Sequence, residues 1–282
     1  MLKYIYQNEN WTDFTWNDKK VSVLLAQVRN LQGRLLGKMS ALGFGFQAEA
    51  TLEIITLDIL KSSEIEGEKL NRAQVRSSIA RRLGIEIAGL VTSARNIDGI
   101  VEMMLDATQR YDLPLTEERM FGWHAALFPT GYSNSYKIDV ACYRKGEMQV
   151  VSGAMGKEKV HFEAVAAEKV KSEMDRFLKW QNTQNDKIDS VVKAAIAHLW
   201  FVTIHPFDDG NGRIARAISD MLLARSDESK QRFYSMSAQI LKERKRYYEV
   251  LEETQHSINS DITVWLDWFL NCLKNALSHS RH

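Results

Sequence analysis

Apolar residues recur at steps of three and four positions along most of this chain, the spacing that gives an α-helix one buried face. The stretch 190–204 differs because nearly every position is apolar, and it predicts a helix surrounded by the core. These patterns predict an all-α, mainly helical fold. Helices are expected at 18–42, 47–63, 71–84, 92–111, 116–128, 162–183, 190–204, around 214–222, at 237–256 and from 261 onward.

One stretch, 131–162, interrupts the helical pattern. It contains two short β-prone runs, Cys142–Arg144 and Met148–Gly153, which are separated by Gly146. Short runs of this kind, joined at a glycine, predict a β-hairpin. The fold expected for the whole chain is therefore a set of helices with one small β-hairpin.

The segment between the two most apolar helices, residues 205–216, reads HPFDDGNGRIAR. Gly210 and Gly212 let the backbone come close to a ligand, and the free N–H groups at the start of the next helix favour anions. Arg213 and Arg216 are three positions apart, so they share a helical face and can both reach phosphate oxygens. This inventory suits the binding of a phosphorylated ligand.

Two further side chains in this segment add chemistry. Asp209 can hold a divalent cation, which binds carboxylate oxygens and keeps substrate phosphates in its coordination shell. His205 titrates near neutral pH and can accept a proton from an incoming hydroxyl. The segment therefore predicts a site that holds a nucleoside triphosphate and activates an alcohol. The alternative is an ordinary Asx-Gly turn with exposed arginines, but such a turn requires only the Asn-Gly pair.

Residues 205–216 resemble the signature of the Fic family, His-x-Phe-x-(Asp/Glu)-Gly-Asn-Gly-Arg-x-x-Arg, and fill each of its specified positions. The resemblance implies transfer of AMP from ATP to a hydroxyl of a protein, with release of pyrophosphate. It makes His205 the general base and Phe207 a buried anchor. It also implies that Asp209 holds a Mg²⁺ ion that bridges the α- and β-phosphates.

The same resemblance implies the ligands of the three phosphates. Asn211 and the N–H groups near Gly210 and Gly212 would hold the α-phosphate. Arg213 and Arg216 would hold the β- and γ-phosphates.

A second stretch, Ser62-Ser63-Glu64-Ile65-Glu66-Gly67, resembles the inhibitory motif of the Fic family, (Ser/Thr)-x-x-x-Glu-(Gly/Asn). Ser62 and Glu66 are four positions apart and so lie on one helical face, and Gly67 is suited to end the helix. The resemblance implies that Glu66 pairs with Arg216 and holds ATP in an unproductive pose. An exposed acidic helix end is the alternative, because a six-residue motif with three specified positions is weak by itself.

The predicted hairpin also has a counterpart in the Fic family. There, a hairpin ahead of the signature forms a flap that aligns the target segment by strand addition. The resemblance assigns this target-docking role to Met148, Gln149, Val150 and Val151. A purely structural hairpin is the alternative.

The run Leu31–Met39, LQGRLLGKM, is similar to an N-terminal helical domain of unknown function that is attached to some Fic proteins. This similarity predicts two domains. Residues 1–85 would form the N-terminal helical domain, which includes the inhibitory helix, and residues 86–282 would form the Fic catalytic core.

Composition limits the partners. The 282 residues include 37 Lys and Arg against 36 Asp and Glu, so the net charge of +1 gives no footprint for nucleic acid or an anionic membrane. No apolar run approaches the roughly eighteen residues of a membrane span, and the N-terminus lacks the apolar core of a signal peptide. Cys142 and Cys272 are too few for a disulfide framework. These features predict a cytoplasmic protein.

The sequence thus predicts an autoinhibited protein adenylyltransferase that moves AMP from Mg·ATP to a Ser, Thr or Tyr hydroxyl of a target protein or of itself. One alternative is an enzyme on the same scaffold that uses another nucleotide or removes AMP from a modified protein. Another is a nucleotide-binding regulatory module without turnover, although pure binding would not need His205 as a base. Formation of a homo-oligomer is compatible with the sequence.

Overall fold

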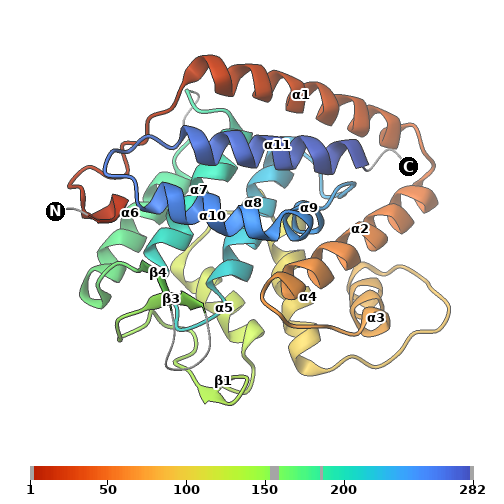
Figure 1. The fold of residues 1–282 in the computed structure, drawn as a ribbon. Coiled ribbons are helices and arrows are strands. Elements are labelled where there is room, and N and C mark those ends of the chain that lie inside the picture. Colours follow the sequence, from red (N-terminus) through yellow and green to blue (C-terminus); the bar gives the residue numbers. More distant parts are fainter. Residues whose placement is uncertain (1–2, 153–158, 185–186, 280–282) are drawn as a thin grey trace.

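The structure is a computed structural model that describes residues 3–152, 159–184 and 187–279. These residues form a mainly helical molecule, which confirms the predicted fold class (Figure 1). No helix within these ranges has both the length and the apolar character needed to cross a bilayer. The described α-helices are α1 (Asp18–Ser40), α2 (Phe44–Ile65), α3 (Arg72–Leu83), α4 (Arg95–Gln109), α5 (Glu117–Leu127), α6 (Val170–Asn182), α7 (Ser190–Ile204), α8 (Asn211–Asp227), α9 (Met236–Lys242), α10 (Arg244–Gln255) and α11 (Thr263–His279).

Short elements complete the described fold. They are two 3-10 helices and four strands: η1 (Ile5–Gln7), η2 (Ala167–Lys169), β1 (Tyr132–Ser133), β2 (Tyr136–Lys137), β3 (Gln149–Ser152) and β4 (Lys159–Glu163).

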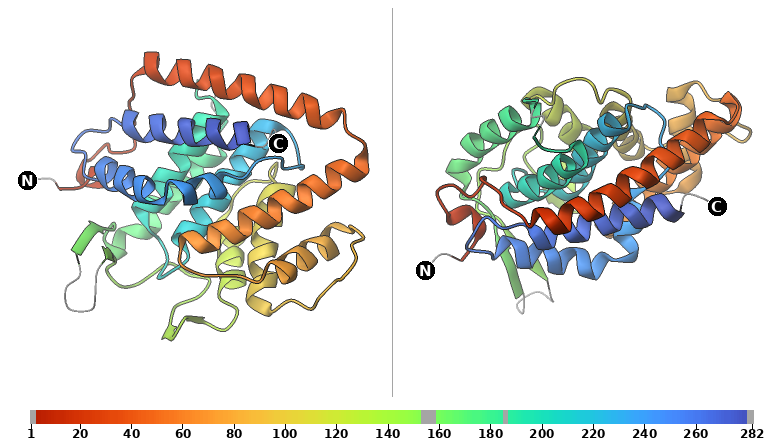
Figure 2. Two further views of the ribbon diagram at one scale, coloured as in Figure 1. Left: turned by 45° about the vertical axis from the view of Figure 1, so that its right-hand side comes forward. Right: turned by 90° about the horizontal axis from the view of Figure 1, so that it is seen from above.

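Helices α7 and α8 lie side by side at the centre of the molecule (Figure 1, Figure 2). All residues of α7 from 191 to 204 are buried, because α6, α8 and α11 pack around it. This environment explains why the sequence of α7 is apolar on nearly every side. The connection between α7 and α8, residues 205–210, is consequently mounted on two helices that the core holds in place.

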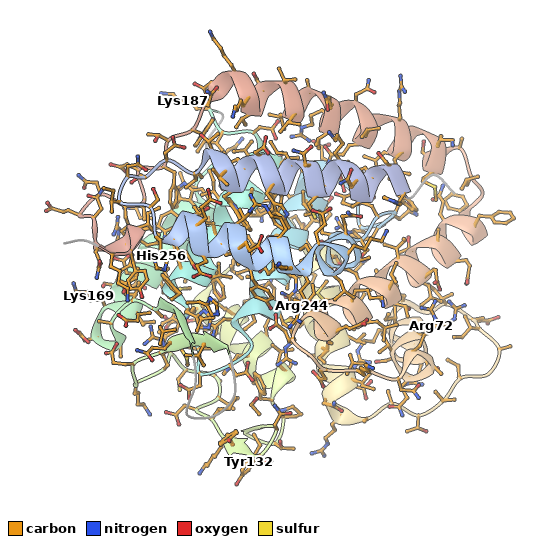
Figure 3. All side chains as sticks on the ribbon, in the orientation of Figure 1. Arg72, Tyr132, Lys169, Lys187, Arg244 and His256 are labelled. Carbon is orange, nitrogen blue, oxygen red and sulfur yellow. The ribbon has the colours of Figure 1, made fainter. Side chains whose placement is uncertain are left out.

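The N-terminal helices cover this centre. Helix α1 lies along α11, and α2 packs against α9 and reaches α8 with its C-terminal half (Figure 1). The apolar side chains of α1 and α2 belong to the same hydrophobic cluster as those of α7 and α8. Arg244, labelled in Figure 3, fixes the end of α2, because its Nε donates a hydrogen bond of 2.8 Å to the carbonyl of Ile65.

The stretch that interrupts the helical pattern forms two antiparallel pairs in the described residues, β1 with β2 and β3 with β4. The predicted strand at Cys142–Arg144 was wrong. Gln149–Ser152, part of the second predicted run, forms β3 and pairs with β4, Lys159–Glu163. The last residues of β4 had been expected to begin the helix over 162–183. Phe162 is buried while Val160, two positions earlier, is exposed, because the register shifts between these two residues and breaks the period of two. So short and irregular a strand is hard to separate from a helical pattern. Residues 153–158, Gly153 among them, lie outside the described residues.

The helix predicted over 237–256 is divided in two. Helix α9 ends at Lys242 and α10 begins at Arg244, because Glu243 leaves the helical conformation with φ −110° and ψ 23°. Neither glycine nor proline marks this junction in the sequence, so periodicity alone could not place it.

Candidate active site

The connection between α7 and α8 is shaped by two residues in the left-handed conformation. His205 ends α7 with φ 55° and ψ 60°, and Gly210 precedes α8 with φ 83°. Glycine adopts this conformation freely, whereas a residue with a side chain loses roughly 1–2 kcal/mol there. Strain of this kind persists only where surrounding contacts impose it, and it concentrates at functional sites.

The ring of His205 has a defined orientation. Its Nδ1 lies 3.2 Å from the carbonyl oxygen of Val202, and because a carbonyl only accepts, Nδ1 carries the proton. In the neutral ring Nε2 is then free to accept a proton. Burial lowers the pKa of His205 below its ordinary value, so the ring is neutral at pH 7. The imidazole therefore has the protonation state of a general base.

Asn211, the first residue of α8, closes the loop on itself. Its Oδ1 accepts from the backbone N–H of Phe207 at 2.9 Å, and its Nδ2 donates to the carbonyl of the same residue at 2.8 Å. Phe207 is fully buried. Both ends of the Asn211 carboxamide thus bind the loop, and its Nδ2 keeps a second N–H beside the backbone N–H groups at the start of α8.

His124 of α5 supports the same loop from the other side. Its Nδ1 accepts from the N–H of Ala141 at 3.2 Å, so Nε2 carries the proton and donates to the carbonyl of Asp209 at 3.1 Å. The imidazole also stacks on Phe207, with centroids 4.2 Å apart. Burial lowers the pKa of His124 to about 4, which keeps the ring neutral. Sequence patterns indicate only that His124 is a core residue.

Asp209 is the carboxylate predicted to hold a metal ion. Its Oδ1 accepts from the N–H of Gly210 at 2.6 Å, and its Oδ2 accepts from the Ser133 hydroxyl at the end of β1. The described residues contain no cluster of three or more His, Cys, Asp or Glu side chains suited to a metal. A cation at Asp209 would therefore take most of its ligands from phosphates and water, which is the manner in which Mg²⁺ commonly binds.

Arg216 of α8 is buried and contacts the end of α2. Its Nε donates to the Ser62 hydroxyl at 2.8 Å, and its NH2 group donates to the Ser62 carbonyl at 2.9 Å and to Glu66 Oε1 at 2.6 Å. The ion pair expected between Glu66 and Arg216 is thus present. Gly67, with φ 84°, follows and turns the chain away.

Gly212 makes room for this carboxylate. A Cβ atom at position 212 would collide with Glu66 Oε1 and would lie 3.0 Å from its Cδ. The Glu66 carboxylate therefore sits against the first turn of α8, where no side chain caps the helix. Helix N-termini attract anions through their free N–H groups and the helix dipole. Glu66 thus lies at the place that an anionic ligand would favour.

The other arginine of the segment is also paired. Arg213 NH1 donates to Glu68 Oε2 at 2.9 Å, and its guanidinium lies 5.1 Å from the ring centroid of Phe128. No sequence motif points to Glu68, which lies just beyond the stretch Ser62–Gly67. The two carboxylates that follow α2 neutralise both arginines.

The four residues predicted to dock a target lie at and just before β3. Met148 precedes the strand, and Gln149, Val150 and Val151 form it. In the described residues β3 pairs on one side only, with β4, so its other edge is open for a further strand. This arrangement is compatible with strand addition.

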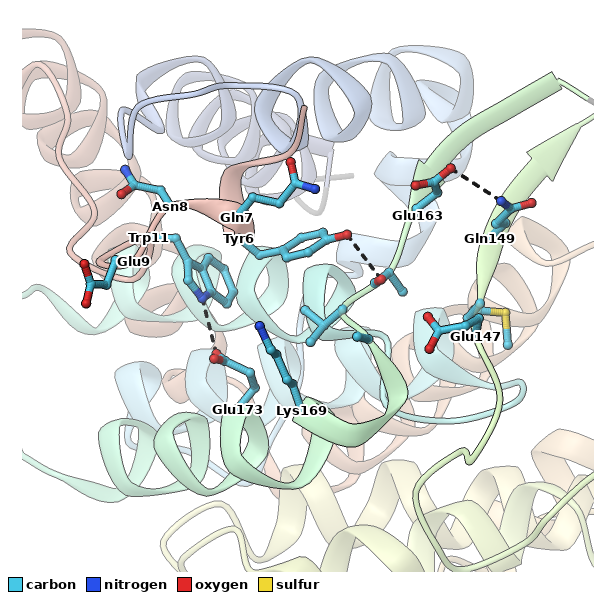
Figure 4. Close-up of a pocket in the computed structure, with 14 residues that line it drawn as sticks. Tyr6, Gln7, Asn8, Glu9, Trp11, Glu147, Gln149, Glu163, Lys169 and Glu173 are labelled. Atoms are coloured by element: carbon cyan, nitrogen blue, oxygen red, sulfur yellow. Dashed lines mark hydrogen bonds between the residues drawn. The ribbon is translucent and has the colours of Figure 1, made fainter. Parts of the chain in front are cut away.

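A cavity of about 660 Å³ lies at the base of the β3–β4 hairpin (Figure 4). Tyr6 and Glu9 near the N-terminus, Glu147 before β3 and Glu173 on α6 contribute to its wall (Figure 4). None of the residues 205–216 lines it. The candidate active site is therefore defined by the α7–α8 connection and the end of α2, not by this cavity.

Two family models match parts of the chain. A model described as the Fic/DOC family matches residues 114–223, and a model described as a domain of unknown function, DUF4172, matches residues 4–85. The chain contains a Fic/DOC family domain that follows a DUF4172 domain, and residues 205–216 fall in the last part of the former.

Relatives at the level of sequence carry the name protein adenylyltransferase. The Fic protein of Nematostella vectensis is 20% identical over 229 residues, which are 78% of this chain and 47% of that protein. The fic-1 protein of Caenorhabditis elegans is 39% identical over 66 residues, 23% of this chain and 13% of that protein. The chain therefore covers less than half the length of these curated relatives.

Solved structures share the fold. A Fic family protein from Desulfovibrio desulfuricans has a TM-score of 0.66 at 22% identity, covering 92% of this chain and 73% of that one. A Fic domain containing signaling protein from Bacteroides thetaiotaomicron has a TM-score of 0.63 at 20% identity, covering 93% of this chain and 96% of that one. At these identities the likeness shows the fold alone.

Proposed function

We propose that this protein is an adenylyltransferase that transfers AMP from Mg·ATP to a hydroxyl group of a protein. The observation that carries the proposal is the position of Glu66. Its carboxylate occupies the N-terminus of α8 beside Arg216, so the chain fills an anion site with its own acid. A nucleoside triphosphate supplies an anion that would compete for the same place.

The reaction follows from the orientation of His205. Its free Nε2 accepts the proton of the attacking hydroxyl. The hydroxyl oxygen bonds to the α-phosphorus as the bond to the β-phosphate oxygen breaks, and pyrophosphate leaves. The N–H groups at the start of α8, with Arg213 and Arg216, stabilise the charge that develops on the phosphate oxygens. A Mg²⁺ ion held by Asp209 would neutralise further phosphate charge.

We propose further that the enzyme restrains itself. With Arg216 paired to Glu66 and Arg213 paired to Glu68, both guanidinium groups are engaged by carboxylates. A γ-phosphate can bind productively only when at least the pair with Glu66 opens. The restrained state is thus the ground state of the chain.

Intact-protein mass after incubation with Mg·ATP tests the proposal. The three samples are the wild type, Glu66→Gly, and Glu66→Gly combined with His205→Ala. We expect the mass to rise by one AMP moiety in Glu66→Gly alone, because only this protein has a free Arg216 together with the base. No gain in any sample, with ATP binding demonstrated by calorimetry, would refute AMP transfer.

Removal of AMP from a modified protein is a second candidate. It is favoured by the position of the Glu66 carboxylate at the first turn of α8, the helix that follows the loop begun by His205. A carboxylate beside the base can orient a water molecule for attack on the phosphorus. Adding unmodified wild type to self-modified Glu66→Gly protein tests this reaction, and loss of the added mass is the expected outcome. Persistence of the modification would restrict the protein to transfer.

A further inference from the structure

We infer that Arg144 is a positioning residue that fixes the base His205 and links it mechanically to the β3–β4 hairpin. This inference rests on the proposed function. The sequence predicts a short strand that ends at Arg144 and assigns this residue no role, and no comparison with other proteins assigns it one. The side chain is only 3% exposed.

Arg144 binds the carbonyl groups at the end of α7. Arg144 Nε donates to the carbonyl of His205 at 2.7 Å, and its backbone N–H donates to the carbonyl of Pro206 at 2.9 Å. Its NH2 group lies 3.4 Å from the carbonyl of Ile204. Three consecutive carbonyl groups are thus held by one residue, and their directions determine the backbone conformation of His205.

The charge of Arg144 suits this position. The last carbonyl groups of a helix lack partners within the helix and form its negative end. A guanidinium satisfies several of them at once because its donors are fixed in one plane. Among the described residues Arg144 forms no ion pair with a carboxylate, so backbone carbonyls carry most of its hydrogen bonding. This arrangement can maintain His205 in its strained left-handed conformation.

Arg144 also binds both ends of the β3–β4 hairpin. Arg144 NH1 donates to the carbonyl of Gly146 at 2.8 Å, and NH2 donates to the carbonyl of Val165. Gly146 lies just before β3 and Val165 lies just after β4, so one guanidinium holds both ends of the hairpin. Val165 also lines the cavity at the hairpin base. A target segment that pairs with β3 is therefore positioned relative to the same group that positions the base.

Arg144 also acts on the ring electrostatically. The charged groups that influence His205 are Arg144, which lowers its pKa, and Glu66 and Asp209, which raise it. Replacement by lysine keeps the positive charge but removes the planar set of donors. Replacement by methionine removes both. Comparing the two variants therefore separates the effect of the hydrogen bonds of Arg144 from the effect of its charge.

The test uses the full chain with Glu66→Gly as the parent, so that the restraint is absent. Arg144→Lys and Arg144→Met are compared with Arg225→Lys, a matched control. Arg225 also donates to backbone carbonyls, those of Tyr111 and Leu113, but it lies in the last turn of α8. Thermal unfolding confirms that each variant folds, and rates of self-modification at several ATP concentrations give kcat and KM.

We expect Arg144→Lys to lower kcat by about tenfold to a hundredfold, the effect of a displaced catalytic group, while KM for ATP stays within about twofold. Arg225→Lys leaves kcat unchanged. In Arg144→Met the acidic limb of the pH–rate profile also moves up, toward the ordinary histidine value of about 6.5. Equal kcat values for Arg144→Lys and Arg225→Lys would overturn the inference.

A second measurement makes the inference independent of turnover. Nitrogen chemical shifts of the His205 ring, recorded by NMR in the parent and in Arg144→Lys, report its tautomer directly. We expect a single Nδ1-protonated form in the parent and a mixture of tautomers in Arg144→Lys. If the parent transfers no AMP, the proposed function fails, and this spectrum still decides the role of Arg144, because identical spectra would exclude it.

Discussion

The two sides of the α7–α8 connection are held in different ways. On one side Asn211, His124 and Arg144, whose side chains are buried, make hydrogen bonds to backbone groups. On the other side Glu66 and Glu68 reach the arginines from a loop, and their side chains are 32% and 37% exposed. Losing a buried hydrogen bond costs about 1–3 kcal/mol. Each ion pair of the second side joins a buried arginine to a partly exposed carboxylate, which water can solvate when the pair opens. We therefore expect the hydrogen bonds of the first side to persist and the ion pairs of the second side to open.

The largest expected effect is on the persistent side. Asn211→Ala leaves the N–H and the carbonyl of Phe207 buried without partners, so we expect the free energy of unfolding to fall by about 2–4 kcal/mol. AMP transfer by the Glu66→Gly parent should be lost as well, because the loop no longer has one conformation. Urea denaturation and intact-protein mass measure the two effects.

Asn182→Ala is the control for this prediction. Asn182 clasps the N–H and the carbonyl of Leu115 with the same pair of bonds, but at a more exposed position outside the connection. We expect a smaller loss of stability and unchanged transfer. Equal loss of transfer in both variants would show that Asn211 acts only through global stability.

The next largest effect is a pH dependence of stability from His124. Its pKa is about 4 in the folded chain and about 6.5 when unfolded, so below pH 6.5 the unfolded chain binds more protons. The stabilisation is therefore complete above pH 6.5 and is lost as pH falls toward 4, by about 3 kcal/mol in total. Urea denaturation across this range should show a shallower dependence for His124→Gln. Parallel curves would contradict the neutral, buried assignment.

The sequence predicts much of this fold because most of its determinants are local. Period and apolarity locate the helices, including the buried α7, and fixed spacing brings Ser62 and Glu66 to one face of α2. Strand β4 was missed because an alternation over five residues is no stronger than the helical pattern beside it. Local patterns in the sequence therefore identify Glu66 and the two arginines on the side that opens, because these residues belong to short motifs.

The persistent side could not be predicted in this way. Arg144, His124 and Ser133 act on carbonyl groups or on a carboxylate about 60 to 85 positions away along the chain. A carbonyl group is the same in every residue, so the sequence carries no sign of which one will be bound. Only the folded backbone decides which carbonyl groups a buried arginine or histidine meets.

On the side that opens, Glu66→Gln should have the larger effect. The amide removes the negative charge beside Arg216, and we expect Mg·ATP to bind at least about tenfold more tightly, equivalent to about 1.4 kcal/mol. Calorimetry measures this affinity without requiring turnover. Glu64→Gln is the control, because Glu64 lies in the last turn of α2, two residues before Glu66, and pairs with Lys61, not with an arginine of the site. Similar affinities of the two variants for Mg·ATP would show that Glu66 does not restrain nucleotide binding.

The smallest expected effect belongs to Glu68→Gln. Glu68 is more exposed than Glu66, and Arg213 keeps its contact with the ring of Phe128 when the ion pair is lost. We therefore expect the affinity for Mg·ATP to rise only about twofold to fivefold, because water already solvates part of this carboxylate. Combining Glu66→Gln with Glu68→Gln sharpens the comparison. If the two carboxylates act separately on Arg216 and Arg213, the gains multiply, whereas a gain no larger than that of Glu66→Gln would mean that releasing Arg216 already releases Arg213.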